Sequence, residues 1–300
     1  MDGVSLFSVS ADRTLQQRDL VKNEPSWKQR KAHPAAINCV TTLAEAGVAT
    51  GDDNGGLTLW DLRQRAAALS FSEHSDFISD ILFVPEKGQQ LAVSSGDGHL
   101  SLYDLRRGRL NALSDNQEEE LSCLALVKQG RKLLCGTQSG VLGIFSWGDF
   151  GDVSDRLVGH PDAIDAMVAY DDDVVFTGSS DGLIRAVSVH PNAVLGLVGE
   201  HANGVEALAL GAERSRLASC SHEGIVQLWD VGELRGMAGA EQEDDSVAAK
   251  AKEASGRELD SEDDAPCSRH EPQLPAHKKL KATSKGNAAI KMSTDFFADM

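Results

Sequence analysis

Four histidines recur about 41 residues apart, or twice that distance, in the first 201 residues. Each is followed at a similar distance by a polar residue in a predicted turn. They are His33, His74, His160 and His201. A histidine that faces a carboxylate can act as a general base when a nucleophile stands beside it. The same pair can instead belong to a buried hydrogen-bond network that only stabilises the fold. Four repeated copies favour the structural interpretation.

In the predicted network each histidine bonds the turn acid, and through a Ser or Thr it reaches the indole N–H of the following tryptophan. In the last copy the participants are His201, Glu223, Ser219 and Trp229. A buried polar group is stable when all of its hydrogen bonds are made, which explains why these residue types occur together. We assign to the structural network His33, His74, His160, His201, Asp97, Asp181, Trp60 and Trp229.

Motifs for a chemical reaction are missing from the sequence. It contains no G-x-S-x-G, no H-E-x-x-H, no phosphate-binding P-loop and no G-x-G-x-x-G. The five cysteines form no C-x-x-C pair and no metal-ligand spacing. We therefore expect no enzymatic activity, no cofactor, no metal and no small-molecule substrate.

The histidines belong to a longer internal repeat. A strand of small residues, a turn and a second strand recur six times, with 42 or 43 residues between corresponding turn residues. A further apolar strand precedes the last five copies, and several copies end in Trp-Asp or a similar pair. The turn residues are Asp12, Asn54, Asp97, Ser139, Asp181 and Glu223.

This repeat predicts an all-β fold, the WD-repeat β-propeller, with helix nearly absent before Arg235. The dipeptides Asn54-Gly55, Asp97-Gly98 and Asp181-Gly182 can adopt the positive φ angles of a two-residue hairpin turn. Five complete blades and most of a sixth are visible. The sequence therefore divides into an N-terminally incomplete propeller over residues 1–235 and a tail over residues 236–300.

Some copies depart from the pattern. The first lacks its innermost strand and its histidine, and Arg18 stands where the second copy has Trp60. The fourth has Ser139 for the turn acid and Asn116 near the histidine position, while the fifth has Val187 for Trp. Because an incomplete blade leaves a sheet edge exposed, we expect either imperfect ring closure or a chain that lacks its beginning.

Charge restricts the partners. The formal net charge is −17, and binding to phosphates needs clustered Lys and Arg, so direct nonspecific binding to nucleic acid is not expected. No apolar run approaches the ~18 residues of a membrane span. We expect protein partners, while oligomeric state and partner identity stay open.

The tail is predicted to be disordered, because residues 241–264 are strongly acidic and nearly free of large apolar side chains. Lys278, Lys279 and Lys281 resemble a nuclear import signal, although a solvated charge cluster explains them equally well. Ser261 precedes three acids and suits an acid-directed kinase. Phe296 and Phe297 are candidate anchors for a partner.

The segment Trp60-Asp61-Leu62-Arg63 matches the W-D-x-R ending of substrate receptors of cullin-type ubiquitin ligases. In that reading Trp60, Asp61 and Arg63 contact the ligase adaptor. The motif is short and common among WD repeats, so an ordinary strand end is the competing explanation. Tyr103-Asp104-Leu105-Arg106 is a weaker copy.

Several stretches resemble the nucleolar WD repeat-containing protein 55 family and its yeast ribosome-biogenesis relatives, from about Leu6 to Arg235. The resemblance implies a seven-bladed propeller, a scaffold role in ribosomal RNA synthesis or processing and in ribosome biogenesis, pre-ribosomal protein partners, and a nuclear and nucleolar location, with the cytoplasm left open. Asp155, Arg156 and Arg185 lie in these stretches and are candidate partner contacts. The resembling stretches are 49–53 with 55–56, Trp147 with 150–151 and 154–156, 182–187, 191–192, Gly199 and 293–298.

Overall fold

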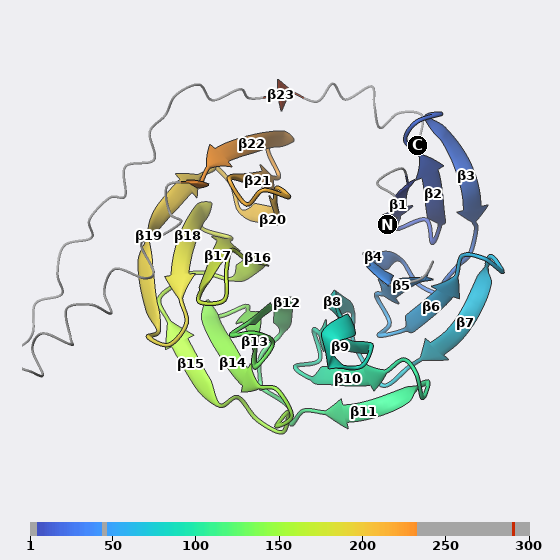
Figure 1. Ribbon diagram of the computed structural model, residues 1–300, viewed down its shortest axis with the longest axis horizontal. Helices are drawn as coiled ribbons and strands as arrows, with labels where there is room; N and C mark the ends of the chain where they lie inside the picture. The colour runs from blue at the N-terminus through green and yellow to red at the C-terminus, as the bar shows by residue number, and fades with distance from the viewer. Residues whose placement is uncertain (1–4, 44–46, 233–289, 292–300) are drawn as a thin grey trace, which may run out of the picture.

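Six β-sheets lie around a ring in the computed structural model (Figure 1). The structure describes residues 5–43, 47–232 and 290–291. In these residues one short 3-10 helix, η1 (Pro85–Lys87), is the sole helix, and no helix is long and apolar enough to cross a membrane. The prediction of an all-β propeller is confirmed.

In the second to fifth sheets the four strands follow one another along one stretch of chain, and the first of them is innermost. The first sheet has three strands, β1 (Ser5–Val9), β2 (Leu15–Asp19) and β3 (Glu24–Gln29). The second has β4 (Ile37–Leu43), β5 (Gly47–Asp52), β6 (Leu57–Asp61) and β7 (Ala66–Phe71). The third has β8 (Ile78–Val84), β9 (Gln90–Ser95), β10 (Leu100–Asp104) and β11 (Arg109–Leu113).

The remaining three sheets repeat this order. The fourth has β12 (Leu121–Val127), β13 (Lys132–Thr137), β14 (Val141–Ser146) and β15 (Asp155–Val158). The fifth has β16 (Ile164–Ala169), β17 (Val174–Ser179), β18 (Leu183–Ser188) and β19 (Ala193–Glu200). The last has β20 (Val205–Leu210), β21 (Arg216–Ser221), β22 (Ile225–Asp230) and β23 (Ile290–Lys291).

The repeated hairpin turn differs in detail from the prediction. The Gly55 N–H donates to the Asp52 carbonyl at 3.3 Å, and the Asp52 N–H donates to the Gly56 carbonyl at 3.0 Å. This is a three-residue turn, with only its last residue at positive φ. Our two-residue assignment was therefore wrong, because Asn54 keeps an ordinary φ. The residues at positive φ in the six turns are Arg13, Gly55, Gly98, Gly140, Gly182 and Gly224.

The turn glycines also determine how neighbouring sheets meet. A Cβ on Gly55 would lie 2.4 Å from the His74 carbonyl oxygen, and one on Gly182 would lie 2.5 Å from that of His201. The turn of one sheet therefore packs directly on the backbone of the histidine that precedes the next sheet. Glycine is required there by close approach as well as by φ.

Apolar side chains between successive sheets form the core. The innermost strands β4, β8, β12, β16 and β20 contact one another in that order, and β1 contacts β4. In the second to fifth sheets the third strand directs two apolar side chains toward the next sheet. The fully buried Tyr103, Phe145 and Phe176 fill the space between sheets. The small inner-strand residues predicted from the sequence allow this close packing.

The ring has an opening between the first and last sheets (Figure 1). The first sheet lacks the innermost strand that the other sheets possess, as predicted. In the last sheet, β23 pairs with the outer edge of β22 in the register Ile225–Lys291 and Val226–Ile290. The sequence analysis did not predict this strand, which lies in the segment expected to be disordered.

Candidate functional site

The second sheet contains the most complete histidine network. His33 Nε2 lies 2.7 Å from the Thr50 hydroxyl oxygen, and the Trp60 indole N–H donates to the same oxygen at 2.8 Å. His33 Nδ1 lies 2.8 Å from a carboxylate oxygen of Asp52. The network is confirmed, but its acid is Asp52, two residues before the turn residue Asn54. The adjacent Asp52-Asp53 pair was the sequence signal for this assignment.

The third sheet modifies the pattern. His74 Nδ1 lies 3.2 Å from Asp97, as predicted, and Nε2 lies 2.7 Å from the hydroxyl of Ser101 on β10. Tyr103 replaces the tryptophan. Burial lowers the pKa of His74 despite the nearby Asp97 carboxylate. Burial of His74 therefore favours the neutral imidazole over the charged one.

In the last sheet the predicted link between His201 and Glu223 is wrong. Glu223 instead accepts the backbone N–H groups of Ala202 and Asn203 at 2.5 and 3.0 Å. Glu223 thus makes the loop contact that Asp97 makes to the Ser75 N–H in the third sheet, without the bond to the histidine. His201 retains its bond to Ser219 at 2.7 Å, and the Trp229 indole donates to that hydroxyl at 2.8 Å.

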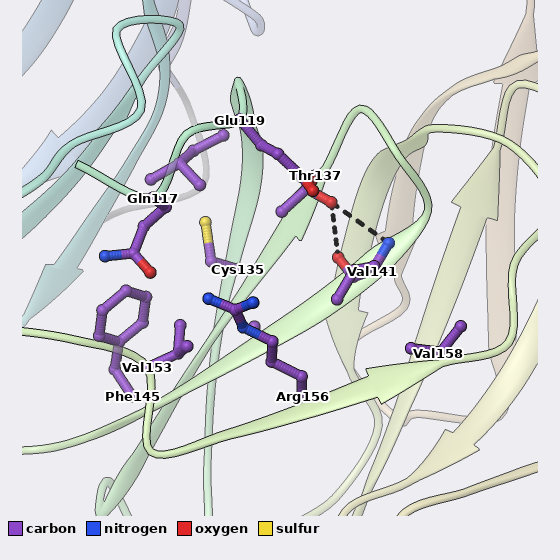
Figure 2. A pocket seen from close by; sticks show the side chains of 11 residues that line it. Gln117, Glu119, Cys135, Thr137, Val141, Phe145, Val153, Arg156 and Val158 are labelled. Carbon is purple, nitrogen blue, oxygen red and sulfur yellow. Dashed lines mark hydrogen bonds between the residues drawn. The ribbon is translucent and has the colours of Figure 1, made fainter.

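The fourth sheet has a small cavity beside the corresponding position (Figure 2). The Gln117 N–H donates to the Gly98 carbonyl at 2.9 Å, as the His201 N–H does to Gly182. Gln117, and not Asn116, therefore occupies the histidine position. Its spacing of 43 residues from both His74 and His160 could have revealed this. The cavity, of about 180 Å³, is lined by Gln117, Glu119, Leu121, Cys135, Thr137, Val141, Gly143, Phe145, Val153, Arg156 and Val158.

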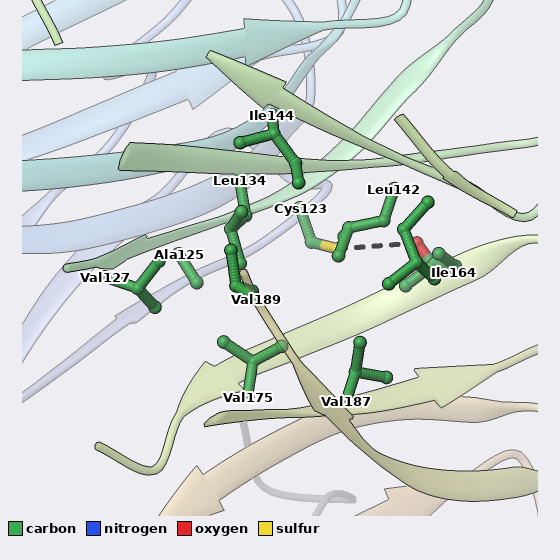
Figure 3. Packing of buried hydrophobic residues seen from close by; sticks show 11 residues of the cluster. Cys123, Ala125, Val127, Leu134, Leu142, Ile144, Ile164, Val175, Val187 and Val189 are labelled. Atoms are coloured by element: carbon green, nitrogen blue, oxygen red, sulfur yellow. Dashed lines mark hydrogen bonds between the residues drawn. The ribbon is translucent and has the colours of Figure 1, made fainter. Parts of the chain in front are cut away.

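In the fifth sheet Arg185, and not His160, binds the turn acid Asp181. Arg185 donates to both carboxylate oxygens of Asp181, at 3.1 and 2.6 Å. His160 bonds to Thr177 at 2.8 Å, and its Nδ1 is buried without a hydrogen-bond partner in the described part of the chain. The predicted His160–Asp181 pair is therefore wrong. Val187, which replaces the tryptophan, packs in the apolar cluster between the fourth and fifth sheets (Figure 3).

These networks offer little chemistry to a substrate. The four histidines are buried, each 4–8% exposed. Their ring nitrogens bond to Ser, Thr, Asp or Gln side chains of their own sheet, except for His160 Nδ1, which has no partner among the described residues. Among the described residues, no group of three His, Cys, Asp or Glu side chains could hold a metal ion. The arrangement supports a role in stabilising the fold.

The predicted adaptor motif lies beside a surface groove. Trp60, Asp61 and Arg63 all line a pocket of about 270 Å³ between the second and third sheets. Trp60 is itself buried, and Asp61 accepts the Arg63 backbone N–H at 2.8 Å, which fixes the turn. The Arg63 side chain is exposed. The other lining residues are Leu43, Gly47, Leu59, Ala68, Leu69, Phe83, Gln89 and Leu105.

Of the other candidate contacts, two lie at the surface and one does not. Asp155 accepts a hydrogen bond from Asn192 at 2.6 Å, which joins the fourth and fifth sheets. Arg156 is exposed and lines the cavity of the fourth sheet. The Arg185 side chain is 12% exposed and paired inward with Asp181, so we place it in the structural network. Lys278, Lys279, Lys281, Ser261, Phe296 and Phe297 lie outside the described residues.

Comparison with known proteins identifies close relatives. A family model described as WDR55 matches residues 1–234. WD repeat-containing protein 55 of Mus musculus is 39% identical over 235 residues, which cover 78% of this chain and 60% of the relative. WD repeat-containing protein 55 of Arabidopsis thaliana is 36% identical over 78% of this chain and 66% of the relative. The chain thus spans about three fifths of the mouse relative.

A solved structure shows the same fold. The crystal structure of the computationally designed Ika8 protein superposes with a TM-score of 0.62 and covers 77% of this chain and 70% of that chain. The sequence identity is 21%. At this identity, the similarity shows only that the two proteins share a fold.

Proposed function

The chain belongs to the WD repeat-containing protein 55 family, and from this premise we propose that it is a non-enzymatic interaction scaffold in ribosome biogenesis. The proposed setting is the nucleolus, where it assists the synthesis or processing of ribosomal RNA. Its partners are then pre-ribosomal proteins. Family membership is the observation that carries this proposal, together with the resemblance of the stretches named above.

Potentially reactive side chains, the four network histidines with Cys123 and Cys135, are buried inside the sheets, which supports a scaffold role over catalysis. The histidines and their acids serve hydrogen bonds within single sheets, and burial raises the pKa of the Cys123 thiol to about 12 and that of Cys135 well above its usual value. A thiol needs its thiolate form to act as a nucleophile. The buried groups therefore stabilise the sheets and leave the loops and edges for partners.

Charge supports protein partners over bare RNA. The formal net charge of the chain is −17, and phosphate contacts require local positive charge. Recognition through protein surfaces avoids this repulsion. We therefore propose that the protein meets precursor ribosomes through their protein components.

Affinity purification of the full chain from nuclear extract tests the proposal. We expect recovery of pre-ribosomal proteins, and we expect depletion of the protein to cause accumulation of unprocessed ribosomal RNA or a fall in its synthesis. Normal ribosomal RNA levels and intermediates after depletion would contradict the proposal.

The groove beside Arg63 favours a second candidate function, that of a substrate receptor for a cullin-type ubiquitin ligase. The exposed guanidinium stands next to an apolar groove that contains Leu69, which is 36% exposed. An arginine beside an apolar pocket is a frequent anchor in protein interfaces. Recovery of a ligase adaptor in the same purification would separate this function from the first, although the two are compatible.

A further inference from the structure

The cavity of the fourth sheet lies where three positions of the repeat hold unusual side chains. Gln117 occupies the histidine position, as described above. Cys135 stands 42 residues before Thr177, the hydroxyl residue of the fifth sheet. On the third strand, Gly143 pairs with Cys135, whereas in the fifth sheet Arg185 pairs with Thr177. Glycine in place of a long side chain leaves space, and the cavity of about 180 Å³ occupies it.

One wall of the cavity carries a buried oxygen that lacks a hydrogen bond. The side-chain N–H of Gln117 donates to the Asp115 carbonyl at 2.8 Å. This bond fixes the orientation of the amide, so that its oxygen end faces the cavity (Figure 2). Gln117 Oε1 is buried and has no hydrogen-bond partner in the described part of the chain. An amide oxygen only accepts hydrogen bonds, so the cavity suits a ligand that has an O–H or N–H group.

A second wall carries a guanidinium that has no acidic partner. Arg156 lies on β15 directly opposite Gly143, and its side chain points into the cavity (Figure 2). In the fifth sheet the arginine at the position of Gly143, Arg185, pairs with the turn acid Asp181. The fourth sheet has Ser139 at that turn position. The Arg156 side chain makes no hydrogen bond or ion pair with a described residue.

The remaining walls are mostly apolar, and the cavity reaches the surface. Leu121, Phe145 and Val153 line it. Val158, which also lines it, is 78% exposed. A cavity of about 150 Å³ is large enough to bind benzene. The cavity of the fourth sheet therefore has room for one six-membered ring that enters from the solvent past Val158.

We propose that this cavity binds a tyrosine side chain presented by a partner protein. The ring lies against Phe145 and Val153, and the phenol O–H donates to Gln117 Oε1. The Arg156 guanidinium covers the face of the ring, because a cation is attracted to the electron-rich face of an aromatic ring. This inference goes beyond the proposed function, which gives the cavity no role, and either of the two can fail without the other.

Hydrogen bonding and charge favour tyrosine over other side chains. A carboxylate would be attracted by Arg156, but it would also face Gln117 Oε1 and the Glu119 carboxylate, which line the same cavity and repel it. Phenylalanine fits the apolar walls but leaves the Gln117 oxygen unsatisfied. The exposed Val158 offers an apolar surface to the chain on either side of the tyrosine, and tyrosine and arginine are enriched in protein interfaces. A tyrosine within a protein therefore fits better than a free phenol.

Two amino-acid amides that differ by one hydroxyl test the site in the full chain. N-acetyl-tyrosinamide and N-acetyl-phenylalaninamide are titrated, and NMR of the Val153 and Val158 methyl groups reports binding at the cavity. We expect the tyrosine amide to bind about tenfold more tightly, the ratio that about 1.4 kcal/mol produces. Gln117→Leu should remove this preference without weakening the binding of the phenylalanine amide, and that retained binding shows that the variant keeps the fold and the cavity.

A second variant tests the guanidinium. Arg156→Gln should weaken the binding of both amides by the same factor, about threefold, because it removes the attraction to the ring and not the bond to the hydroxyl. Arg109→Gln, at an exposed arginine on β11 that does not line the cavity, is the matched control and should change neither affinity.

Four outcomes would overturn the proposal. Equal affinity of the parent protein for the two amides would exclude the bond to Gln117, and no binding of either would leave the cavity to water. Binding of 4-methylphenol without binding of the tyrosine amide would assign the cavity to a free phenol. Tighter binding of the corresponding aspartate amide would assign it to a carboxylate.

Discussion

Arg185 donates hydrogen bonds to both carboxylate oxygens of Asp181, at 3.1 and 2.6 Å. His160, which the repeat would pair with Asp181, is therefore left without an acidic partner. Burial raises the pKa of Asp181, but the hydrogen bonds from Arg185, the Leu183 backbone and Ser179, together with the Arg185 charge, outweigh it and lower the pKa. For His160, burial comes first and the Arg185 charge second, and together they lower its pKa to about 4. One substituted residue thus rearranges a three-residue network.

Arg185→Gln should raise the pKa of His160, because it removes the nearby cation and releases the Asp181 carboxylate. The variant should also lose about 1–3 kcal/mol of stability, the usual cost of leaving a buried polar group unsatisfied. Titration of the imidazole by NMR and urea denaturation measure the two effects. Arg156→Gln, at an exposed arginine in the preceding sheet, is the matched control and should change neither value.

His160 should also make stability depend on pH. Its pKa lies near 4 in the folded protein and at 6.5 when unperturbed, so the unfolded chain takes up the proton first. The contribution is complete above pH 6.5 and is lost as the pH falls toward 4, by up to about 3 kcal/mol. His160→Gln should show a shallower loss of stability over this range in urea denaturation. His74 and His201, whose pKa values are also lowered, remain in both proteins and cancel in the comparison. An identical pH slope would contradict the assignment.

Thr50→Val should destabilise the protein more than Thr177→Val. The Thr50 hydroxyl serves both His33 and the Trp60 indole, so valine leaves two buried groups unsatisfied, at about 1–3 kcal/mol each. Thr177 serves one such side chain, His160. Thermal unfolding compares the two variants, which have nearly the same shape as the parent. Equal losses would mean that the indole bond contributes little.

Arg63→Ala should abolish co-purification of a ubiquitin-ligase adaptor if the second candidate function holds. The side chain is exposed and its backbone turn is fixed by Asp61, so the fold and its melting temperature should be unchanged. Arg106→Ala, at the weaker copy of the motif, is the control and should retain the adaptor. Equal adaptor recovery with both variants would exclude Arg63 as the contact.

Replacing Lys278, Lys279 and Lys281 with alanine should shift the protein from the nucleus to the cytoplasm, as measured by imaging of a tagged chain. These lysines have no acidic neighbour in residues 277–291, and import receptors recognise such uncompensated charge. The control replaces Lys250 and Lys252, which lie in the acidic stretch, and should stay nuclear. If the triple variant stays in the nucleus, the three lysines are not an import signal and are only a solvated charge cluster.

The sequence repeat predicted the sheets well because each sheet depends on local properties, namely strand alternation and, in five of the six turns, a glycine at positive φ. It predicted the histidine partners less well. Glu223 and Asp181 stand at equivalent turn positions, yet one bonds to backbone and the other to Arg185. The identity of the acid and the residue on the adjacent strand differ between these two sheets, and a linear repeat pattern does not show which partner each acid takes. The pairing of β22 with β23 joins residues more than sixty positions apart, which no period of 42 could reveal.

The order of the sheets has a consequence for folding of the chain during translation. The first five sheets each come from one continuous stretch of chain, so they can form in turn as synthesis proceeds from the N-terminus. Each new sheet covers the apolar face of the one before it, so a single such face at a time meets the solvent. The last sheet alone among the six receives its outer strand from residues near the end of the chain, and it is completed after translation has released them.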